Sequence, residues 1–441
     1  MKLRLLALAI VTALVIGLSY VGFDSRADAR RAAPVAAPAV DGMAYSQREL
    51  ARLIAAFERD VHRTPNATGL SFLGGLYLQR ARTTGDLGSY EQAGAALDDA
   101  LRRAPDDSET LARKASYLYR THDFAGALDL ATRITTADPK ALGALAVMGD
   151  AQLELGRDDA AASTYQRLAA AAPDTPSVDV RRSHLAFVTG DVPTAERFAR
   201  QAEREAVASG EFGVGLAYYR EARAQIRFDQ GDLAGAARLY EQALRDAPGY
   251  YATEALLAKT RAAQGRTAEA IRLYRRAIAQ VPQPDYLAAL GDLYAVTGRH
   301  AAAEQQYRTV ELTGTLAAIN RQVYNRQLAV FDADHGRHVD DAVRLATGEL
   351  ALRQDAFGYD TAAWALFAAG RFDEARAASD HALAFNVPDA RFAYHAGMIA
   401  KGQGDAARAH TLLTRALRLN PHFDVLQARR ARAALRALRT R

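Results

Sequence analysis

The fold is decided by residues 287–307, whose sequence is LAALGDLYAVTGRHAAAEQQY. In the first half, Leu290 and Tyr294 lie four residues apart, which places their side chains on one face of a helix. A glycine with a basic neighbour then interrupts the pattern, as is typical of a helix end. In the second half, Ala303 and Tyr307 are again four residues apart. The stretch therefore predicts two helices joined by a tight turn.

The same arrangement recurs along the chain at a fixed interval. Pro105, Pro139 and Pro173 are spaced by 34 residues, and the same interval separates Pro248 from Pro282. A period of this size indicates stacked supersecondary units. Each proline follows the second helix of a unit and ends it, because proline has no N–H and disfavours helix in the residue before it.

A small residue marks the second helix of each unit. We expect two helices to approach closely at this position, so that a larger side chain would cost about 1–3 kcal/mol by forcing them apart. Ten positions follow this rule: Ala93, Ala127, Ala161, Ala195, Ala236, Ala270, Ala303, Ala342, Ala375 and Ala409. The sequence therefore predicts about ten units over residues 66–421.

This pattern resembles the tetratricopeptide repeat family, whose unit follows Trp-x2-Leu-Gly-x2-Tyr, then Ala-x3-Phe, then Pro. Residues 287–294 match the first part and residues 303–307 match the second. Residues 257–282 and 149–173 keep further parts of the pattern. The resemblance implies an all-α fold, a right-handed α-solenoid of stacked helix-turn-helix repeats.

Three places depart from the regular period. The interval between marker alanines widens from Ala195 to Ala236 and from Ala303 to Ala342, and the first unit is irregular around residues 82–90. The units at Ala195, Ala303 and Ala342 also lack the closing proline. We expect longer helices or loops there, and the sequence does not fix the boundaries of these units.

The N-terminal residues 1–23 have the layout of an export signal. Lys2 and Arg4 precede an apolar run that extends to residue 23. The run approaches the roughly 20 residues that span a bilayer, which favours a retained membrane anchor with the body outside the cytoplasm. The alternatives are cleavage at residues 27–29, which would give a periplasmic or secreted protein, and a buried helix.

The rest of the chain divides by composition. Residues 24–43 are rich in alanine and proline and predict a spacer, and residues 44–65 predict an N-terminal capping helix. Residues 66–421 hold the repeats, and residues 422–441 predict a C-terminal capping helix, because a terminal unit needs a cover for its apolar face. Arginines occupy much of that last helix, so the alternative interpretation is a basic patch for an anionic partner.

Composition excludes several functions. The chain has no cysteine, and its 56 basic and 51 acidic residues are nearly balanced, which gives no pull toward nucleic acid. Neither a phosphate-binding glycine loop, a nucleophile elbow nor a dinucleotide fingerprint occurs in the sequence. We therefore predict no enzymatic activity, no catalytic residues and no cofactor.

The best candidate for chemistry is the segment of residues 332–341, DADHGRHVDD, which carries two histidines and four carboxylates. It lacks the His-Glu-x-x-His spacing and fails the EF-hand pattern. We interpret it as a polar turn between helices and predict no metal site. A metal-dependent activity at His335 and His338 is the lesser alternative.

The resemblance implies that function is recognition, with a peptide or protein segment held on the concave surface formed by the first helices. The residues that the resemblance places in this groove are Tyr119, Arg120, Asp150, Glu154, Tyr218, Glu221, Gln225, Phe228, Lys259, Asp292, Trp364, Phe367, Tyr394 and Lys401. Trp364 is the only tryptophan, and it is predicted either as a binding hot spot or as part of the core.

Two functional hypotheses follow. A membrane-anchored scaffold would organise other proteins, and a soluble exported module would capture a peptide or an envelope polymer. Retention of residues 5–23 discriminates between them. The sequence names neither the partner nor the oligomeric state.

Overall fold

A computed structural model describes residues 47–86, 88–319 and 325–439. The predicted export signal, residues 1–23, and the predicted spacer, residues 24–43, lie outside the described residues. Within them every regular element is a helix, which confirms the all-α prediction. The helices are α2 (Gln47–Arg63), α3 (Ala67–Thr84), α4 (Gly88–Arg103), α5 (Ser108–Arg120), α6 (Phe124–Ala137), α7 (Leu142–Glu154), α8 (Asp158–Ala171), α9 (Pro176–Val188), α10 (Val192–Ala208), α11 (Gly213–Asp229), α12 (Leu233–Asp246), α13 (Tyr251–Ala263), α14 (Thr267–Gln280), α15 (Pro284–Val296), α16 (His300–Ile319), α17 (Asn325–His335), α18 (Val339–Leu352), α19 (Ala356–Ala368), α20 (Phe372–Ala384), α21 (Ala390–Gly402), α22 (Ala406–Leu419) and α23 (Gln427–Arg439).

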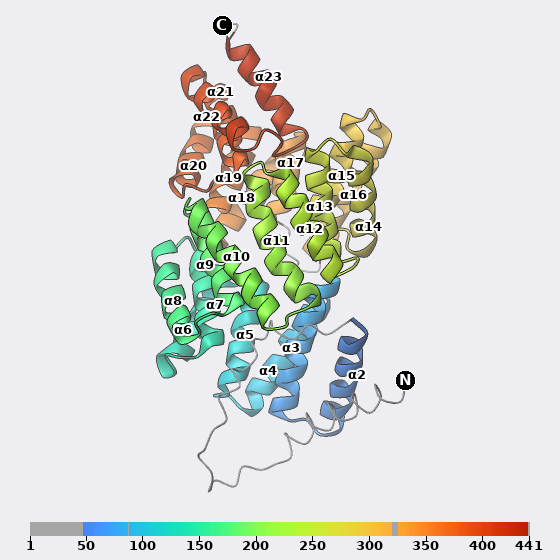
Figure 1. Cartoon of the computed structure of the whole chain (residues 1–441), viewed down its shortest axis with the longest axis vertical. Coiled ribbons are helices and arrows are strands. Elements are labelled where there is room, and N and C mark those ends of the chain that lie inside the picture. Colours follow the sequence, from blue (N-terminus) through green and yellow to red (C-terminus); the bar gives the residue numbers. More distant parts are fainter. Residues whose placement is uncertain (1–46, 87, 320–324, 440–441) are drawn as a thin grey trace. The chain divides into compact units, whose positions relative to one another are not determined.

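Helices α3 to α22 pair in chain order into ten hairpins, and each hairpin packs against the next one (Figure 1). We call the odd-numbered helix of each pair its first helix and the even-numbered helix its second. Helix α2 precedes the first hairpin, and α23 follows the last. The hairpins therefore form the predicted α-solenoid.

The marker alanines lie where the helices approach most closely. All ten are at most 3% exposed. On the first helix, the glycine of the motif makes room for the aromatic ring of the second helix. A Cβ atom added to Gly149 or Gly291 would lie closer than 3.0 Å to the ring of Tyr165 or Tyr307, respectively. The motif glycine is thus needed so that the aromatic ring of the second helix can pack against the first helix.

The irregular intervals correspond to long helices. Helices α10 and α11 have 17 residues each, and α16 has 20 residues. Helix α3 in the first hairpin has 18 residues. The extra turns of helix in α10, α11 and α16 account for the widened spacing of the marker alanines after Ala195 and after Ala303.

The turn of a hairpin in the first half of the solenoid packs against the end of the hairpin five places later. Such a contact places five hairpins in one turn of the superhelix. Hairpins α3 to α12 form the first superhelical turn, and α13 to α22 form the second. Four turn glycines make the contact: Gly85 meets Val281, Gly156 meets Gln354, Gly190 meets Asn386 and Gly231 meets Leu419.

Polar and apolar contacts extend this interface between superhelical turns. The Asn420 side chain, 1% exposed, donates a hydrogen bond of 2.7 Å to the carbonyl of Phe228, 192 residues away in sequence. One continuous apolar cluster joins Met148 and Phe187 of the first turn to Phe392 of the second. The two turns therefore share a core instead of leaving an open gap.

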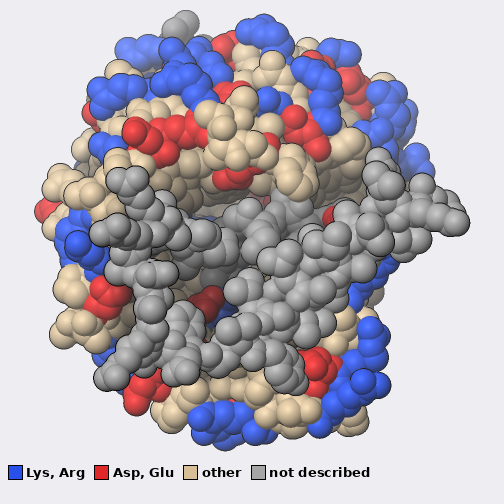
Figure 2. Space-filling model, turned by 60° about the horizontal axis from the view of Figure 1, so that its bottom comes forward, with Lys and Arg blue, Asp and Glu red and all other residues tan. Residues whose placement is uncertain are grey.

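Charges are mixed on the surface. On the face shown in Figure 2, basic and acidic side chains are interspersed among the described residues. This face carries no broad field of one sign of the kind that attracts a nucleic acid backbone.

Candidate functional site

Two adjoining cavities lie between the first helices of the two superhelical turns. The larger has a volume of about 320 Å³ and the smaller about 290 Å³, and both are lined by His184 and Phe357. The walls of the larger cavity come from the first helices of three consecutive hairpins, α9, α11 and α13. Residues at the starts of α19 and α21 complete the walls. The two shared residues place the cavities side by side.

Four charged residues line the larger cavity. Asp389 is the N-cap of α21, and its carboxylate accepts hydrogen bonds from the Arg391 side chain, the shortest being 2.6 Å. Burial and the neighbouring Asp389 raise the pKa of Asp229 to about 7. The Lys259 ammonium lies 4.6 Å from the centroid of the Phe228 ring, and burial together with Arg391 lowers its pKa. The cavity thus presents donors and acceptors close together.

Aromatic and apolar side chains complete the larger cavity. Phe187, Ile226 and Phe357 supply apolar wall, and Tyr218 stands at its edge with 53% of its surface exposed. A mostly apolar pocket with a few fixed polar groups is the usual form of a binding site.

The smaller cavity is held by ion pairs between the superhelical turns. Arg353, which follows α18, lies 2.8 Å from the Glu154 carboxylate on α7 and 4.7 Å from the centroid of the Phe124 ring. Asp355 is the N-cap of α19, and burial raises its pKa to about 6 despite the nearby Arg326. Glu154, Arg326 and Asp355 line the smaller cavity, and Arg353 pairs with Glu154.

The structure distributes the fourteen sequence-derived groove residues over three environments. Four line the interior cavities: Glu154, Tyr218, Gln225 and Lys259. Four are buried in the packing of the helices, at most 9% exposed: Phe228, Asp292, Trp364 and Tyr394. The remaining six lie near these places or on the surface: Tyr119, Arg120, Asp150, Glu221, Phe367 and Lys401.

Most of the last six have partners within the solenoid. Asp150 accepts hydrogen bonds from Tyr165 and Arg181, and the Tyr119 hydroxyl donates to Glu154 at 3.2 Å. Glu221 accepts a hydrogen bond from Thr253, and burial raises the pKa of the Glu221 carboxyl to about 7.

The others differ in exposure. Phe367 stacks on Trp364 with ring centroids 4.9 Å apart, Arg120 is half-buried and Lys401 is exposed. The fourteen side chains therefore do not share one surface, although the family pattern alone places all of them in the groove.

Sequence reasoning missed the cavity residues from the second superhelical turn. Asp355 and Asp389 are readable in the sequence as helix N-caps, since each immediately precedes a helical stretch. Nothing in the sequence pairs these residues with α7 or α11, because the contact depends on how many hairpins complete one superhelical turn.

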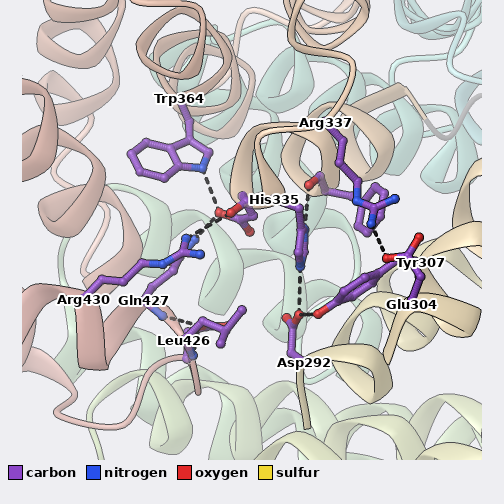
Figure 3. A network of polar contacts seen from close by, with 12 residues as sticks. Asp292, Glu304, Tyr307, His335, Arg337, Trp364, Leu426, Gln427 and Arg430 are labelled. Atoms are coloured by element: carbon purple, nitrogen blue, oxygen red, sulfur yellow. Dashed lines mark hydrogen bonds and ion pairs between the residues drawn. The ribbon is translucent and has the colours of Figure 1, made fainter. Parts of the chain in front are cut away.

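The histidine turn has a structural role in this fold. The His335 Nε2 atom lies 2.8 Å from Asp292 Oδ1, and its Nδ1 atom lies 2.7 Å from the carbonyl oxygen of Phe331 (Figure 3). The same Asp292 oxygen accepts a hydrogen bond from the Tyr307 hydroxyl. His335 therefore fastens α17 to the preceding hairpin. Among the described residues, no three His, Asp or Glu side chains are grouped so that they could hold a metal ion.

A second set of contacts in Figure 3 joins α17 to the C-terminal helix. Asp334 Oδ1 accepts hydrogen bonds of 2.8 Å from the Trp364 indole and 2.6 Å from the Gln427 amide. Arg430 donates to the main-chain carbonyl of Asp334 at 3.0 Å. These bonds and the 3% exposure of Trp364 place the only tryptophan in the core.

We expect the contribution of His335 to stability to depend on pH. Burial lowers the pKa of His335, but the hydrogen bond and charge of Asp292 and the Phe331 carbonyl outweigh burial and raise it above 6.5. Two acceptors suit the doubly protonated ring. A raised folded-state pKa means that this stabilisation is fully present below pH 6.5 and is lost as pH rises through the folded value.

The measurement compares wild type with His335→Gln by thermal unfolding across this pH range. The difference in melting temperature should be largest below pH 6.5 and should shrink above it. The control is His300→Gln, because His300 is exposed at the start of α16, in the preceding hairpin. A difference for His335→Gln that does not change with pH would contradict the assignment.

Helix length and composition also bear on membrane spanning. Within the described part of the chain, no helix combines the length and the apolar character needed to cross a bilayer. The predicted anchor, residues 5–23, lies outside the described residues.

Two family models of the tetratricopeptide repeat match the sequence. One matches residues 118–179 and 227–293, and the other matches residues 78–142. No curated protein matches the chain significantly.

Solved structures with similarity to the chain include several repeat proteins. A thermophilic TPR protein of Thermus thermophilus is 22% identical over 42% of this chain and 98% of its own, with a TM-score of 0.37. The type IV pilus biogenesis factor PilW is 18% identical over 47% of this chain and 93% of its own, with a TM-score of 0.40. The human IFIT1 dimer with PPP-AAAA is 14% identical over 85% of this chain and 95% of its own, with a TM-score of 0.46.

The family models cover hairpins in both superhelical turns. Each hairpin also shows the packing that the repeat motif encodes, with a buried marker alanine in the second helix. The chain therefore contains tetratricopeptide repeats, over residues 78–179 and 227–293, and such repeats form scaffolds for protein–protein interactions.

Proposed function

We propose that this protein is an exported scaffold that binds an extended peptide or protein segment in its interior cavity, and that it acts by binding and not by catalysis. The observation that carries the proposal is the pair of adjoining cavities between the two superhelical turns. Their lining includes Glu154, Tyr218, Gln225 and Lys259, which come from the first helices α7, α11 and α13.

The chemistry of the cavity favours a peptide. The Lys259 ammonium is a donor for a carbonyl oxygen or a carboxylate, and the Asp229 carboxylate is an acceptor for an amide N–H. Phe187 and Phe357 offer apolar surface for a side chain between these groups. An extended backbone presents donors, acceptors and side chains in alternation, which suits this combination.

Photo-crosslinking tests the site. A photoreactive phenylalanine analogue in place of Tyr218, at the cavity edge, should form an adduct with a polypeptide partner in the native envelope. The same analogue in place of Arg275, exposed on α14, is the control and should not form it. Ala222→Trp, which fills the cavity, should abolish the adduct at Tyr218. Adducts that persist in the Ala222→Trp variant would place binding elsewhere.

Export and anchoring are tested at the N-terminus. Cell fractionation with mass spectrometry of the mature protein should find an intact Met1 in the membrane fraction, which supports the anchored scaffold. Cleavage near residues 27–29 instead supports a soluble exported module that binds a peptide or an envelope polymer. A full-length protein in the cytoplasm contradicts export altogether.

A further inference from the structure

Three carboxylates line the smaller of the two cavities, together with one arginine. Glu154 lies at the end of α7 and Asp158 at the start of α8, both in the first superhelical turn. Asp355 and Arg326 come from the second turn. The walls of this cavity therefore carry more negative than positive charge.

The charges of Glu154 and Asp355 are compensated to different degrees. Glu154 is paired with Arg353 at 2.8 Å. Asp355 lies 3.8 Å from the Arg326 guanidinium, and burial raises the pKa of the Asp355 carboxyl to about 6 in spite of this cation. A raised pKa means that the surroundings stabilise the ionised carboxylate poorly. A further cation in the cavity would therefore stabilise Asp355 in its charged form.

Asp158 has no partner within the protein. Its side chain is half-buried, and no other described residue forms a hydrogen bond or an ion pair with its carboxylate. Burial and the neighbouring Asp159 raise the pKa of the Asp158 carboxyl. Because charges removed from water are normally paired, Asp158 is an acceptor that a ligand can engage.

The ring of His184 is a second group without a partner, and it lines both cavities. Neither ring nitrogen makes a hydrogen bond to another residue in the described part of the chain. The residue is exposed, yet burial lowers the pKa of its imidazole, so its accessible surface faces the cavities and not bulk solvent. A neutral imidazole has one acceptor nitrogen. His184 therefore offers a hydrogen bond to a ligand that extends from one cavity into the other.

Apolar side chains form the rest of the smaller cavity: Leu153, Val188, Phe357 and Phe385 line it. The face of an aromatic ring attracts a cation, and the Phe357 ring already lies 5.7 Å from the Arg326 guanidinium. The cavity volume of about 290 Å³ is at the lower end for ligand pockets, which begin at roughly 300 Å³. Such a space suits one long side chain with an apolar stem and a charged head.

We propose that the smaller cavity binds the side chain of a lysine or an arginine from the peptide whose backbone lies in the larger cavity. This inference rests on the proposed function and specifies a residue that the peptide carries. The charged head pairs with Asp158 and Asp355, one from each superhelical turn, and donates a hydrogen bond to His184. The apolar stem lies against Phe357, which lines both cavities.

Charge then selects among peptides. An acidic side chain would meet the unpaired Asp158 with like charge, which disfavours the complex. An apolar side chain would cover Asp158 and leave its charge without water or a partner. Peptides with a basic residue at this place should therefore bind more tightly than otherwise identical peptides.

Selection from a peptide library tests this preference. The probe is a random library of short peptides with blocked ends, applied to the immobilised full-length protein, in detergent if it is membrane-bound. We expect the retained peptides to be enriched several-fold in lysine and arginine relative to the library. The double variant Asp158→Asn with Asp355→Asn should still retain peptides but lose this enrichment. Asparagine is also a good N-cap, so α19 keeps its start in the variant.

The matched control is the double variant Asp159→Asn with Asp405→Asn. Asp159 is the exposed neighbour of Asp158 on α8, and Asp405 is the N-cap of α22. Neither lines the two cavities. The control removes the same net charge, so it should select basic peptides as the wild type does. If both double variants lose the enrichment equally, net charge and not the cavity causes it, and the proposal is wrong.

A double-mutant cycle then locates the cation. The tightest basic peptide and its analogue with norleucine in place of the basic residue are compared by isothermal titration calorimetry. The analogue should bind the wild type at least about tenfold more weakly. The variant that lacks the Asp158 and Asp355 charges should bind both peptides nearly equally. An equal loss in the two proteins would place the basic side chain elsewhere and refute the inference.

The outcomes separate this inference from the proposed function. Retained peptides that show no enrichment in lysine or arginine overturn the inference but leave peptide binding in place. If the wild type retains no peptide at all, the proposed function fails, and the inference fails with it.

Discussion

Gly156→Ala is expected to destabilise the protein much more than Gly370→Ala. Both glycines lie in hairpin turns with left-handed backbone, at φ of 69° and 74°. Any L-residue is strained there by roughly 1–2 kcal/mol, so this cost is common to both variants. A Cβ atom at Gly156 would also lie closer than 3.0 Å to the main-chain oxygen of Gln354, whereas one at Gly370 meets nothing within 4 Å.

The difference between the two variants measures the contact between superhelical turns. A backbone carbonyl cannot rotate away as a side chain can, so the turns must separate locally, at an additional cost of about 1–3 kcal/mol. Urea denaturation followed by circular dichroism gives both midpoints. Equal midpoints for the two variants would mean that the superhelical turns do not touch at Gly156 in solution.

Arg353→Met is expected to have the second large effect. The Arg353 side chain is 8% exposed and pairs with Glu154 at 2.8 Å and with Glu349, which is 3% exposed, at 3.7 Å. Removing the cation leaves a buried carboxylate without its partner, which costs about 3–5 kcal/mol. It also removes an ion pair that joins α7 to the end of α18 across the superhelical turns.

The matched control is Arg344→Met, because Arg344 and Asp341 form an ion pair at the surface, 69% and 58% exposed. Exposed pairs contribute at most about 1 kcal/mol, so this variant should unfold almost as the wild type does. The double variant Arg353→Met with Glu349→Gln should recover part of the loss. If Arg353→Met behaves like Arg344→Met in urea, the buried pair does not hold the turns together.

The packing of one superhelical turn on the next has a consequence for binding. Two adjoining cavities lie between the turns, and Asp355 lines the smaller and Asp389 the larger from the second turn. A ligand in either cavity would contact both turns at once. The two destabilising variants above therefore also test whether an intact interface is required for the crosslink at Tyr218.

The amino-acid sequence by itself determined the fold and the position of its repeats. Helix spacing, turn glycines and closing prolines act within about 34 residues, and the marker alanines that this pattern identified are all buried. Each hairpin makes its contacts with its chain neighbours, so local sequence was sufficient to predict them.

Only the tertiary structure decided which side chains face the interior. Trp364 and Tyr394 carry the residue types of a binding surface, but both are buried in one apolar cluster with residues of α17, α22 and α23. His335 resembles a ligand in sequence, but Asp292, 43 residues away, engages its Nε2 atom. The physical reason is that the pairing of Gly156 with Gln354 depends on the rotation accumulated over five hairpins, which no local pattern encodes.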